Sequence, residues 1–142
     1  MKGKCLCQRV TIEVADNSNF DACHCNKCRR WGSGPFLSID CGSDVTINGN
    51  EHISRYQSSK FAERGFCSYC GTHLFYYFIA AEEYFLSLGI IEADIDFNFN
   101  CQIFFDKKPD YYQFADSTQV LTEQEVYESF DLVDNIHNID DL

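Results

Sequence analysis

The stretch "FCSYCG", residues 66–71, places two cysteines with two residues between them in a tight turn. This spacing aims the sulfurs of Cys67 and Cys70 at one metal ion, and the glycine that follows relieves the strained backbone beyond the second ligand. The partner pair is "CLC" near the start of the chain, where Cys5 and Cys7 lie two positions apart at the mouth of an expected strand and point to one face. The four cysteines predict a tetrahedral zinc site with a structural role, which would fold the first half of the chain back on itself.

A second group, "CHCNKC" at residues 23–28, holds three cysteines. We expect Cys23 and Cys25 to share a face by the same two-residue alternation, with Cys28 brought round by a turn. The seven motif cysteines therefore divide into four and three, and three thiolates leave one coordination position open. An open position is what a zinc ion needs to bind an exchangeable ligand, such as water, an aldehyde oxygen or a substrate thiol.

Other interpretations of the three-cysteine group stay open. Cys41 could complete its shell, which would give two closed structural sites and no chemistry. His24 is disfavoured as a fourth ligand, because its side chain should point away from those of its two neighbours. His73, in "CGTHLF", could approach either site or be a hydrogen-bonded strand histidine. We otherwise expect Cys41 and Cys101 to be small buried hydrophobic residues.

A dense basic cluster follows in "KCRRWGSGP", residues 27–35. Its glycine-rich part, residues 32–34, would let backbone N–H groups approach an anion without obstruction by a Cβ atom, and Trp31 offers an apolar wall. The alternative is a solvated basic turn with a buried tryptophan. The cations expected to hold the carboxylates of a ligand are Lys27, Arg29 and Arg30, with Arg55, Lys60 and Arg64 as weaker candidates.

Composition sets the class of protein. The 142 residues are enough for one domain with a buried core, and the net charge of −11 argues against duplex nucleic acid or an anionic membrane as a partner. The start has no apolar run of secretory-signal length, and the longest apolar stretch, residues 74–81, is too short to span a bilayer. We therefore expect a reducing cytoplasm, where nine cysteines, an odd number, fit metal thiolates better than a disulfide framework.

Short strand-like runs separated by turns predict a mainly β fold, made of small antiparallel sheets around zinc-binding loops. Val10, Ile12 and Val14 alternate with polar residues, as in a half-buried strand. The other apolar runs lie at residues 36–40, 45–47, 72–79, 84–91 and 101–105.

One short C-terminal helix is expected in "LTEQEVYESF", residues 121–130. Thr122 can cap this helix while the Glu125 side chain reaches back to the backbone, which together form a capping box. We expect a single zinc-binding domain over residues 1–130, followed by an acidic tail at residues 131–142.

The motifs "CLC", "CHCNKCRRWGSGPF" and "FCSYCGTHLF", in this order and spacing, resemble the glutathione-dependent formaldehyde-activating enzyme (Gfa-like) family, which also includes centromere protein V. The similarity continues through "FFDKKPDYYQFA" and covers about residues 3–116 and the helix expected after them. One departure is Gln8, at a position where family members commonly have glycine. The resemblance implies a mainly β fold, a structural zinc on Cys5, Cys7, Cys67 and Cys70, and a catalytic-type zinc on Cys23, Cys25 and Cys28.

The founding activity of this family joins glutathione to formaldehyde and is classed as that of a carbon–sulfur lyase. The resemblance therefore implies a zinc-dependent enzyme that acts on the adduct of glutathione, or another thiol, with formaldehyde or a related small aldehyde. We expect the thiol to take the open zinc position as a thiolate, which then attacks the aldehyde carbon. The alternative is a zinc-stabilised binding or interaction module without catalysis.

Overall fold

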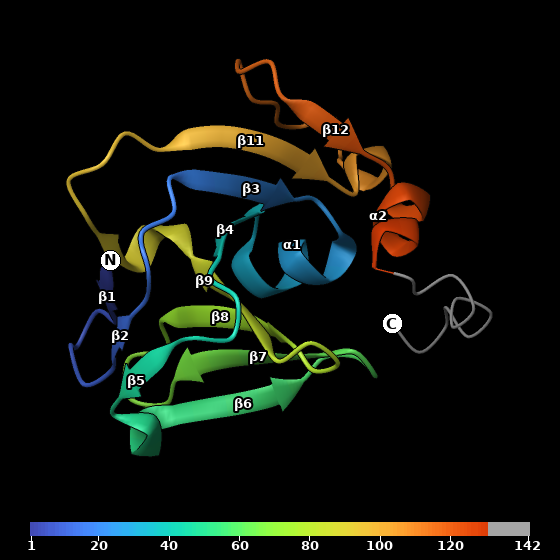
Figure 1. The fold of residues 1–142 in the computed structure, drawn as a ribbon. Coiled ribbons are helices and arrows are strands. Elements are labelled where there is room, and N and C mark those ends of the chain that lie inside the picture. The colour runs from blue at the N-terminus through green and yellow to red at the C-terminus, as the bar shows by residue number, and fades with distance from the viewer. Residues whose placement is uncertain (131–142) are drawn as a thin grey trace.

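The computed structural model describes residues 1–130 and has two β-sheets (Figure 1). The smaller sheet is antiparallel throughout, with the strand order β10–β1–β2–β5. The mainly β fold that the sequence predicts is therefore confirmed. The strands of the smaller sheet are β1 (Lys2–Lys4), β2 (Thr11–Glu13), β5 (Thr46–Asn48) and β10 (Ile91–Glu92).

The larger sheet has the strand order β12–β11–β3–β4–β9–β8–β7–β6. Strand β11 pairs in parallel with both β3 and β12, so the larger sheet is antiparallel except at this edge, where it is mixed. The long chain between β3 and β11 allows this pairing, which a hairpin turn cannot make. The strands are β3 (Asn19–Cys23), β4 (Phe36–Asp40), β6 (Ile53–Gln57), β7 (Ala62–Cys67), β8 (His73–Phe78), β9 (Glu83–Ser87), β11 (Asn98–Ile103) and β12 (Gln119–Leu121).

Within residues 1–130, two α-helices accompany the sheets. Helix α2 (Glu123–Ser129) begins at the predicted capping box: the Thr122 hydroxyl accepts from the Glu125 N–H, and the Glu125 carboxylate accepts from the Thr122 N–H at 2.7 Å. Helix α1 (Asn26–Gly32) stands where the sequence predicts a turn. The remaining helical elements are short 3₁₀ turns, η1 (Asn50–His52), η2 (Leu88–Ile90) and η3 (Phe105–Lys107).

Some apolar runs of the sequence coincide with single strands of the structure, and others do not. The run at residues 36–40 is β4, and the run at 72–79 contains β8. The run at 84–91 divides into β9, η2 and β10. The run at 101–105 leaves β11 early, because Phe104 adopts a left-handed φ of 53° and starts η3. Local backbone turns therefore interrupt runs that look continuous in the sequence.

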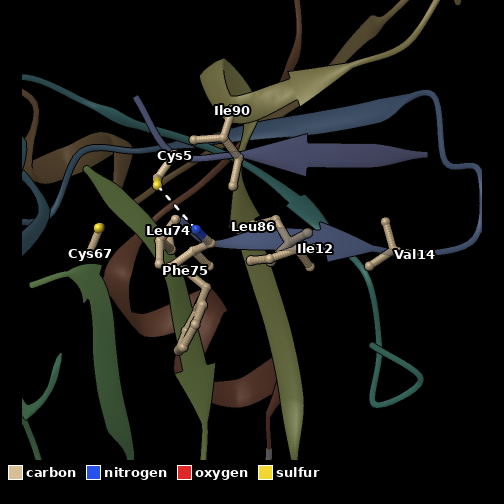
Figure 2. Close-up of a cluster of buried hydrophobic side chains, with 9 residues drawn as sticks. Cys5, Ile12, Val14, Cys67, Leu74, Phe75, Leu86 and Ile90 are labelled. Carbon is tan, nitrogen blue, oxygen red and sulfur yellow. Dashed lines mark hydrogen bonds between the residues drawn. The ribbon is translucent and has the colours of Figure 1, made fainter. Parts of the chain in front are cut away.

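The main hydrophobic core lies between the smaller sheet and strands β8 and β9 of the larger one (Figure 2). The β2 side chain of Ile12 packs there with Phe75 of β8 and Leu86 of β9. Cys5 and Cys67 are part of the same core, so the first cysteine cluster forms one edge of it. The buried members are Cys5, Val10, Ile12, Val14, Cys67, Leu74, Phe75, Leu86 and Ile90.

Two similar turns carry the cysteines of this cluster. The sequence places "CLC" on a strand, but the segment forms a turn in which the Gln8 N–H donates to the Cys5 carbonyl at 2.9 Å. The Gly71 N–H donates to the Cys67 carbonyl, four residues earlier, at 2.8 Å. The residue after the second cysteine is left-handed in both turns, with φ of 64° at Gln8 and 77° at Gly71. Gln8 therefore occupies a conformation that favours glycine.

Residues 131–142, expected as an acidic tail, lie outside the described residues, and the single domain over residues 1–130 stays a prediction. The α-helices α1 and α2 have seven residues each. Within the described part of the chain, no helix combines the length and apolar character needed to cross a membrane.

The two left-handed positions predict stability changes of opposite sign. Gln8→Gly should raise the free energy of unfolding by about 0.5–1 kcal/mol, because it relieves a left-handed side-chain residue. Gly71→Ala should lower it by about 1–2 kcal/mol for the converse reason. No atom lies within 4 Å of the Cβ that Gly71→Ala adds, so packing does not contribute. Urea denaturation of the metal-loaded variants measures both changes, and equal signs would contradict this account.

Candidate metal centres and the adjoining cleft

The first cluster brings together the four cysteines that the two turns present. Their sulfurs all lie within 4.8 Å of one another, with 3.5 Å between Cys5 and Cys7 and 3.7 Å between Cys7 and Cys67. Four thiolates around zinc at 2.3 Å define a tetrahedron whose edges are about 3.8 Å long. The donor set and its spacing therefore fit a closed, four-coordinate zinc ion.

Thr72 supports this cluster from the turn after Cys70. Its hydroxyl accepts from the Leu6 N–H at 3.0 Å and lies 3.1 Å from the Cys70 sulfur. The hydrogen bond between the Thr72 hydroxyl and the Cys70 sulfur is the main reason that the pKa of Cys70 falls to about 5. The lower pKa favours the thiolate, which is the form that binds a metal ion. Thr72 thus connects the two turns, a role that the sequence analysis missed.

The second cluster is built on the junction of β3 and α1. Cys23 ends β3, Cys25 is the N-cap residue of α1, and Cys28 lies in the first helical turn. The Cys28 N–H donates to the Cys25 sulfur at 3.4 Å, so this thiol also caps the helix. A helix brings Cys28 back to its partners, in place of the predicted turn. The three sulfurs lie within 4.8 Å of one another.

These three thiols cannot ionise independently because they share hydrogen bonds. Hydrogen bonds from Cys23 and Cys28 hold the pKa of Cys25 far below its usual range. Hydrogen bonds with Cys25 and Cys28 raise the pKa of Cys23 well above its usual range. One sulfur therefore loses its proton easily while its neighbours keep theirs, and full ionisation of the set requires a bound cation.

The cluster opens on a cleft of about 460 Å³. Its walls come from strands β3, β4, β7, β8, β9 and β11, the 3₁₀ turn η3 and helices α1 and α2, and they are mainly aromatic. The apolar lining consists of Phe36, Phe61, Tyr76, Phe78, Phe85, Ile103, Phe104, Val126, Tyr127 and Phe130. The polar and charged lining besides the cysteines consists of Asn26, Lys27, Ser38, Ser58, Ser59, Arg64, Lys107 and Glu123.

The histidines considered as ligands make other contacts. His24 is fully buried, with Nδ1 2.8 Å from the Tyr112 hydroxyl and Nε2 2.9 Å from Gln102 Oε1. Both ring nitrogens are therefore occupied, as expected for a side chain that points away from the thiols. The His73 ring stacks on Trp31 at 3.9 Å between centroids and joins neither cluster.

The remaining cysteines also lie outside the clusters. The Cys41 thiol donates to the Ile39 carbonyl at 3.5 Å and packs against the main core, so it does not complete the second cluster. Cys101 is buried in β11, as the sequence predicts for a small hydrophobic residue. The second cluster therefore keeps three cysteine ligands within residues 1–130.

Arg64 of β7 is the cation that contacts the second cluster. Its guanidinium is buried, with Nη1 and Nη2 each 3.5 Å from the Cys28 sulfur. The rings of Trp31 and Tyr76 lie 5.1 and 5.3 Å from it and fix its position. Burial opposes the charge on Arg64, but the Cys28 sulfur offsets this effect and raises the pKa of the guanidinium. Arg64, a weaker candidate in the sequence, is thus placed to balance the net −1 charge of a divalent ion held by three thiolates.

The basic cluster of α1 reaches the cleft at one residue. Lys27 lines it and donates from Nζ to the Ser58 carbonyl at 2.8 Å. Arg29 donates from Nε to the His24 carbonyl, and neither it nor Arg30 lines the cleft. The carboxylate-binding role of these two arginines stays a prediction that the lining of this cleft does not support.

The glycine-rich segment and Trp31 also differ from the prediction. Residues 32–34 lie at the C-terminal end of α1, where the Ser33 N–H donates to the Arg29 carbonyl at 2.7 Å. This end of a helix carries partial negative charge and repels an anion. Trp31 lies behind Arg64, outside the lining of the cleft.

Several cleft residues were missed by the sequence analysis because they lie far from the cysteines along the chain. Tyr76 lines the cleft beside the second cluster, and burial raises the pKa of its phenol, so it remains a hydrogen-bond donor at neutral pH. At the α2 wall, Glu123 lies 3.0 Å from Lys107 Nζ and accepts from the Tyr127 hydroxyl at 3.1 Å. No short motif links these residues, so their shared site is visible only in the fold.

The fold and its two cysteine clusters define a mainly β protein suited to hold two metal ions. The model of the glutathione-dependent formaldehyde-activating enzyme family matches residues 1–107, and the chain belongs to this family. An uncharacterized lyase of Schizosaccharomyces pombe is 35% identical over 130 residues, which cover 90% of this chain and 95% of that protein. A Rhodobacter sphaeroides protein of known crystal structure is 31% identical, with a TM-score of 0.57 over 67% of this chain and 91% of its own. Family and clusters together fit a metal-binding enzyme of the lyase type.

The two clusters predict different effects of cysteine substitution. Cys67→Ser should lose one metal ion and unfold at a much lower temperature, because Cys67 belongs to both the first cluster and the main core. Cys25→Ser should lose one metal ion with a far smaller change in stability. Zinc content and thermal melting of the two variants measure these effects. Equal loss of stability in both would contradict the separation of roles.

Arg64 predicts a selective effect on the second centre. Arg64→Gln should weaken zinc binding there by about 10- to 100-fold, because it removes the charge beside the Cys28 sulfur. Competition with a chromophoric chelator resolves the tighter and weaker zinc ions, and the weaker one alone should change. Arg30→Gln, which removes an exposed cation of the same helix region, is the matched control and should have little effect. Similar shifts in both variants would mean that overall charge, and not the contact, matters.

Proposed function

We propose that the chain is a zinc-dependent lyase that makes or breaks a carbon–sulfur bond between a thiol and the carbon of formaldehyde or a related small aldehyde. The observation that carries this proposal is the second cluster. Its three sulfurs converge, no fourth histidine, cysteine or carboxylate joins them within residues 1–130, and all three line the cleft. An incomplete thiolate set beside a cavity is the arrangement of a catalytic zinc site, and not of a closed structural one.

A zinc ion held by Cys23, Cys25 and Cys28 would stabilise a substrate thiol as the thiolate, which is the nucleophilic form. The chain's own part is to hold the three sulfurs at one point and to balance their charge. Arg64 supplies this balance from a buried position, where its interaction with the Cys28 sulfur is little screened by water. The cleft then holds the aldehyde next to the thiol, and such positioning supplies much of the rate for an addition that proceeds readily.

The proposed bond formation is an addition. The thiol gives up its proton to the medium and its sulfur forms a bond to the carbonyl carbon. The carbonyl π-electron pair moves to oxygen, and the oxygen takes up a proton, so that no net proton is lost and the product is a hemithioacetal, which for formaldehyde is the S-hydroxymethyl adduct. Tyr76 is the group that we assign as hydrogen-bond donor to this oxygen, because burial keeps its phenol protonated in the cleft. The reverse sequence breaks the carbon–sulfur bond and releases the aldehyde.

Glutathione is the thiol that the family description names, and a small thiol with a small aldehyde is the substrate pair of this proposal. A cytoplasmic location is part of the same proposal. Seven cysteines that must stay reduced to bind metal favour a compartment in which thiols persist.

The zinc-loaded protein should accelerate the exchange of ¹³C-formaldehyde between its hydrate and its thiol adduct, measured by exchange NMR with glutathione, 2-mercaptoethanol and phenylmethanethiol in separate samples. Cys25→Ser should abolish the acceleration, because it removes one ligand of the second centre. Tyr76→Phe should lower it by about 100-fold while retaining both zinc ions, because it deletes only the hydroxyl.

Cys41→Ser is the matched control, since Cys41 belongs to neither cluster, and it should retain the rate of the parent protein. Exchange at the uncatalysed rate with all three thiols, with both zinc ions bound, would refute the lyase proposal. The chain would then be a zinc-stabilised binding module.

A further inference from the structure

The charges of the cleft are nearly all engaged by other groups of the protein. Arg64 contacts the Cys28 sulfur, and Lys107 pairs with Glu123 at 3.0 Å. Lys27 is then the one lining cation, among the described residues, whose charge no acidic group of the lining offsets. Its Nζ already donates to the Ser58 carbonyl. The cleft therefore offers little to a ligand with several charges.

Glutathione carries two carboxylates, an ammonium group and two peptide bonds. A buried charge without a partner is costly, and two carboxylates would have to share Lys27. The arginines that could have held them, Arg29 and Arg30, do not line the cleft. The volume of about 460 Å³ accommodates a small molecule of either kind, so polarity and not size decides between them.

The apolar wall is continuous around the side that faces α2. Phe130 packs against Phe78 with ring centroids 5.3 Å apart, and Tyr127 packs edge-on against Phe104 at 5.7 Å. Val126 directly precedes Tyr127 in α2 and is buried. Aromatic surfaces of this kind bind apolar and ring-shaped groups.

Helix α2 lies beyond the part of the chain that the family model matches, which ends at residue 107. The helix contributes Glu123, Val126 and Tyr127 to the lining of the cleft. Phe130, directly after the helix, also lines it. In Figure 1, α2 follows β12 at the end of the larger sheet. The wall that α2 forms therefore lies outside the residues that the family model matches.

From these observations we infer that the thiol partner of this centre has an apolar body, such as an aryl or branched alkyl group, and that α2 selects it. This inference rests on the proposed function and names its substrate class. The thiol sulfur faces the second cluster, and the apolar body lies against Phe78, Val126 and Phe130. A thiol with the charges of glutathione is a poorer substrate of this chain than an apolar thiol.

The test compares kcat/KM of formaldehyde exchange for phenylmethanethiol, 2-mercaptoethanol and glutathione with the zinc-loaded protein. Phenylmethanethiol should exceed glutathione by roughly 10-fold or more. Isothermal titration of phenylmethanethiol and of glutathione, each without aldehyde, provides a second readout. Phenylmethanethiol should bind more tightly than glutathione. A protein that favours glutathione in both measurements would overturn the inference.

Variants of Phe130 test the role of α2. Phe130→Ala should lower the preference for phenylmethanethiol over glutathione by roughly 10-fold, whereas Phe130→Leu should restore most of it. Phe130 is 40% exposed, so the loss of its ring should leave the fold intact, which thermal melting checks. Tyr56→Ala removes an exposed aromatic ring of β6 outside the cleft and should leave the preference unchanged.

The outcomes separate this inference from the proposed function. Zinc-dependent exchange with a preference for glutathione, or a Phe130→Ala change equal for all thiols, would overturn the inference and leave the lyase in place. Absence of exchange with every thiol would overturn the lyase proposal and, with it, the substrate class. A preference for phenylmethanethiol over glutathione that Phe130→Ala reduces supports both the lyase proposal and the substrate class.

Discussion

The convergence of four sulfurs at the first cluster is the constraint on which the rest of the structure depends. It holds the turn after β1 against the turn between β7 and β8, and two of its cysteines are buried in the main core. Each turn needs a left-handed residue after its second cysteine, which is Gln8 in one and Gly71 in the other. The smaller sheet and the β7–β8 pair are therefore fixed relative to each other by ligand geometry as well as by hydrophobic packing.

Strand β7 connects this constraint to the chemistry. It ends at Cys67 of the first cluster and carries Arg64 three residues earlier, so the strand that anchors the core also delivers the cation of the second cluster. Successive residues of a strand are about 3.3 Å apart, which separates the two roles by roughly 10 Å. Arg64 is held between the rings of Trp31 and Tyr76, one from α1 and one from β8. The second cluster thus depends on elements from both halves of the chain.

Local patterns made the most accurate predictions from the sequence. Cysteine spacing identified both sulfur sets, and the Thr122–Glu125 capping box identified α2, because these arrangements involve residues a few positions apart. Contacts between distant residues escaped: Arg64 and Cys28 are 36 positions apart, and the cleft combines residues of nine separate elements. Closeness in the sequence also does not place Arg30 beside Cys28: it lies two positions later in α1, about 200° around the helix axis, and does not line the cleft. Parallel pairing of β11 likewise has no local signature.

The two sulfur sets differ in how much chain must be ordered before they can close. Within the triad, Cys25 and Cys28 are three positions apart, whereas Cys7 and Cys67 of the tetrad are separated by 60. Closing the longer loop costs roughly 2–3 kcal/mol more chain entropy. An ion that meets the nascent polypeptide therefore encounters the compact donor set first, and the long-range one forms only as the sheets assemble. Metal availability during synthesis thereby influences the order of folding steps as well as the final occupancy.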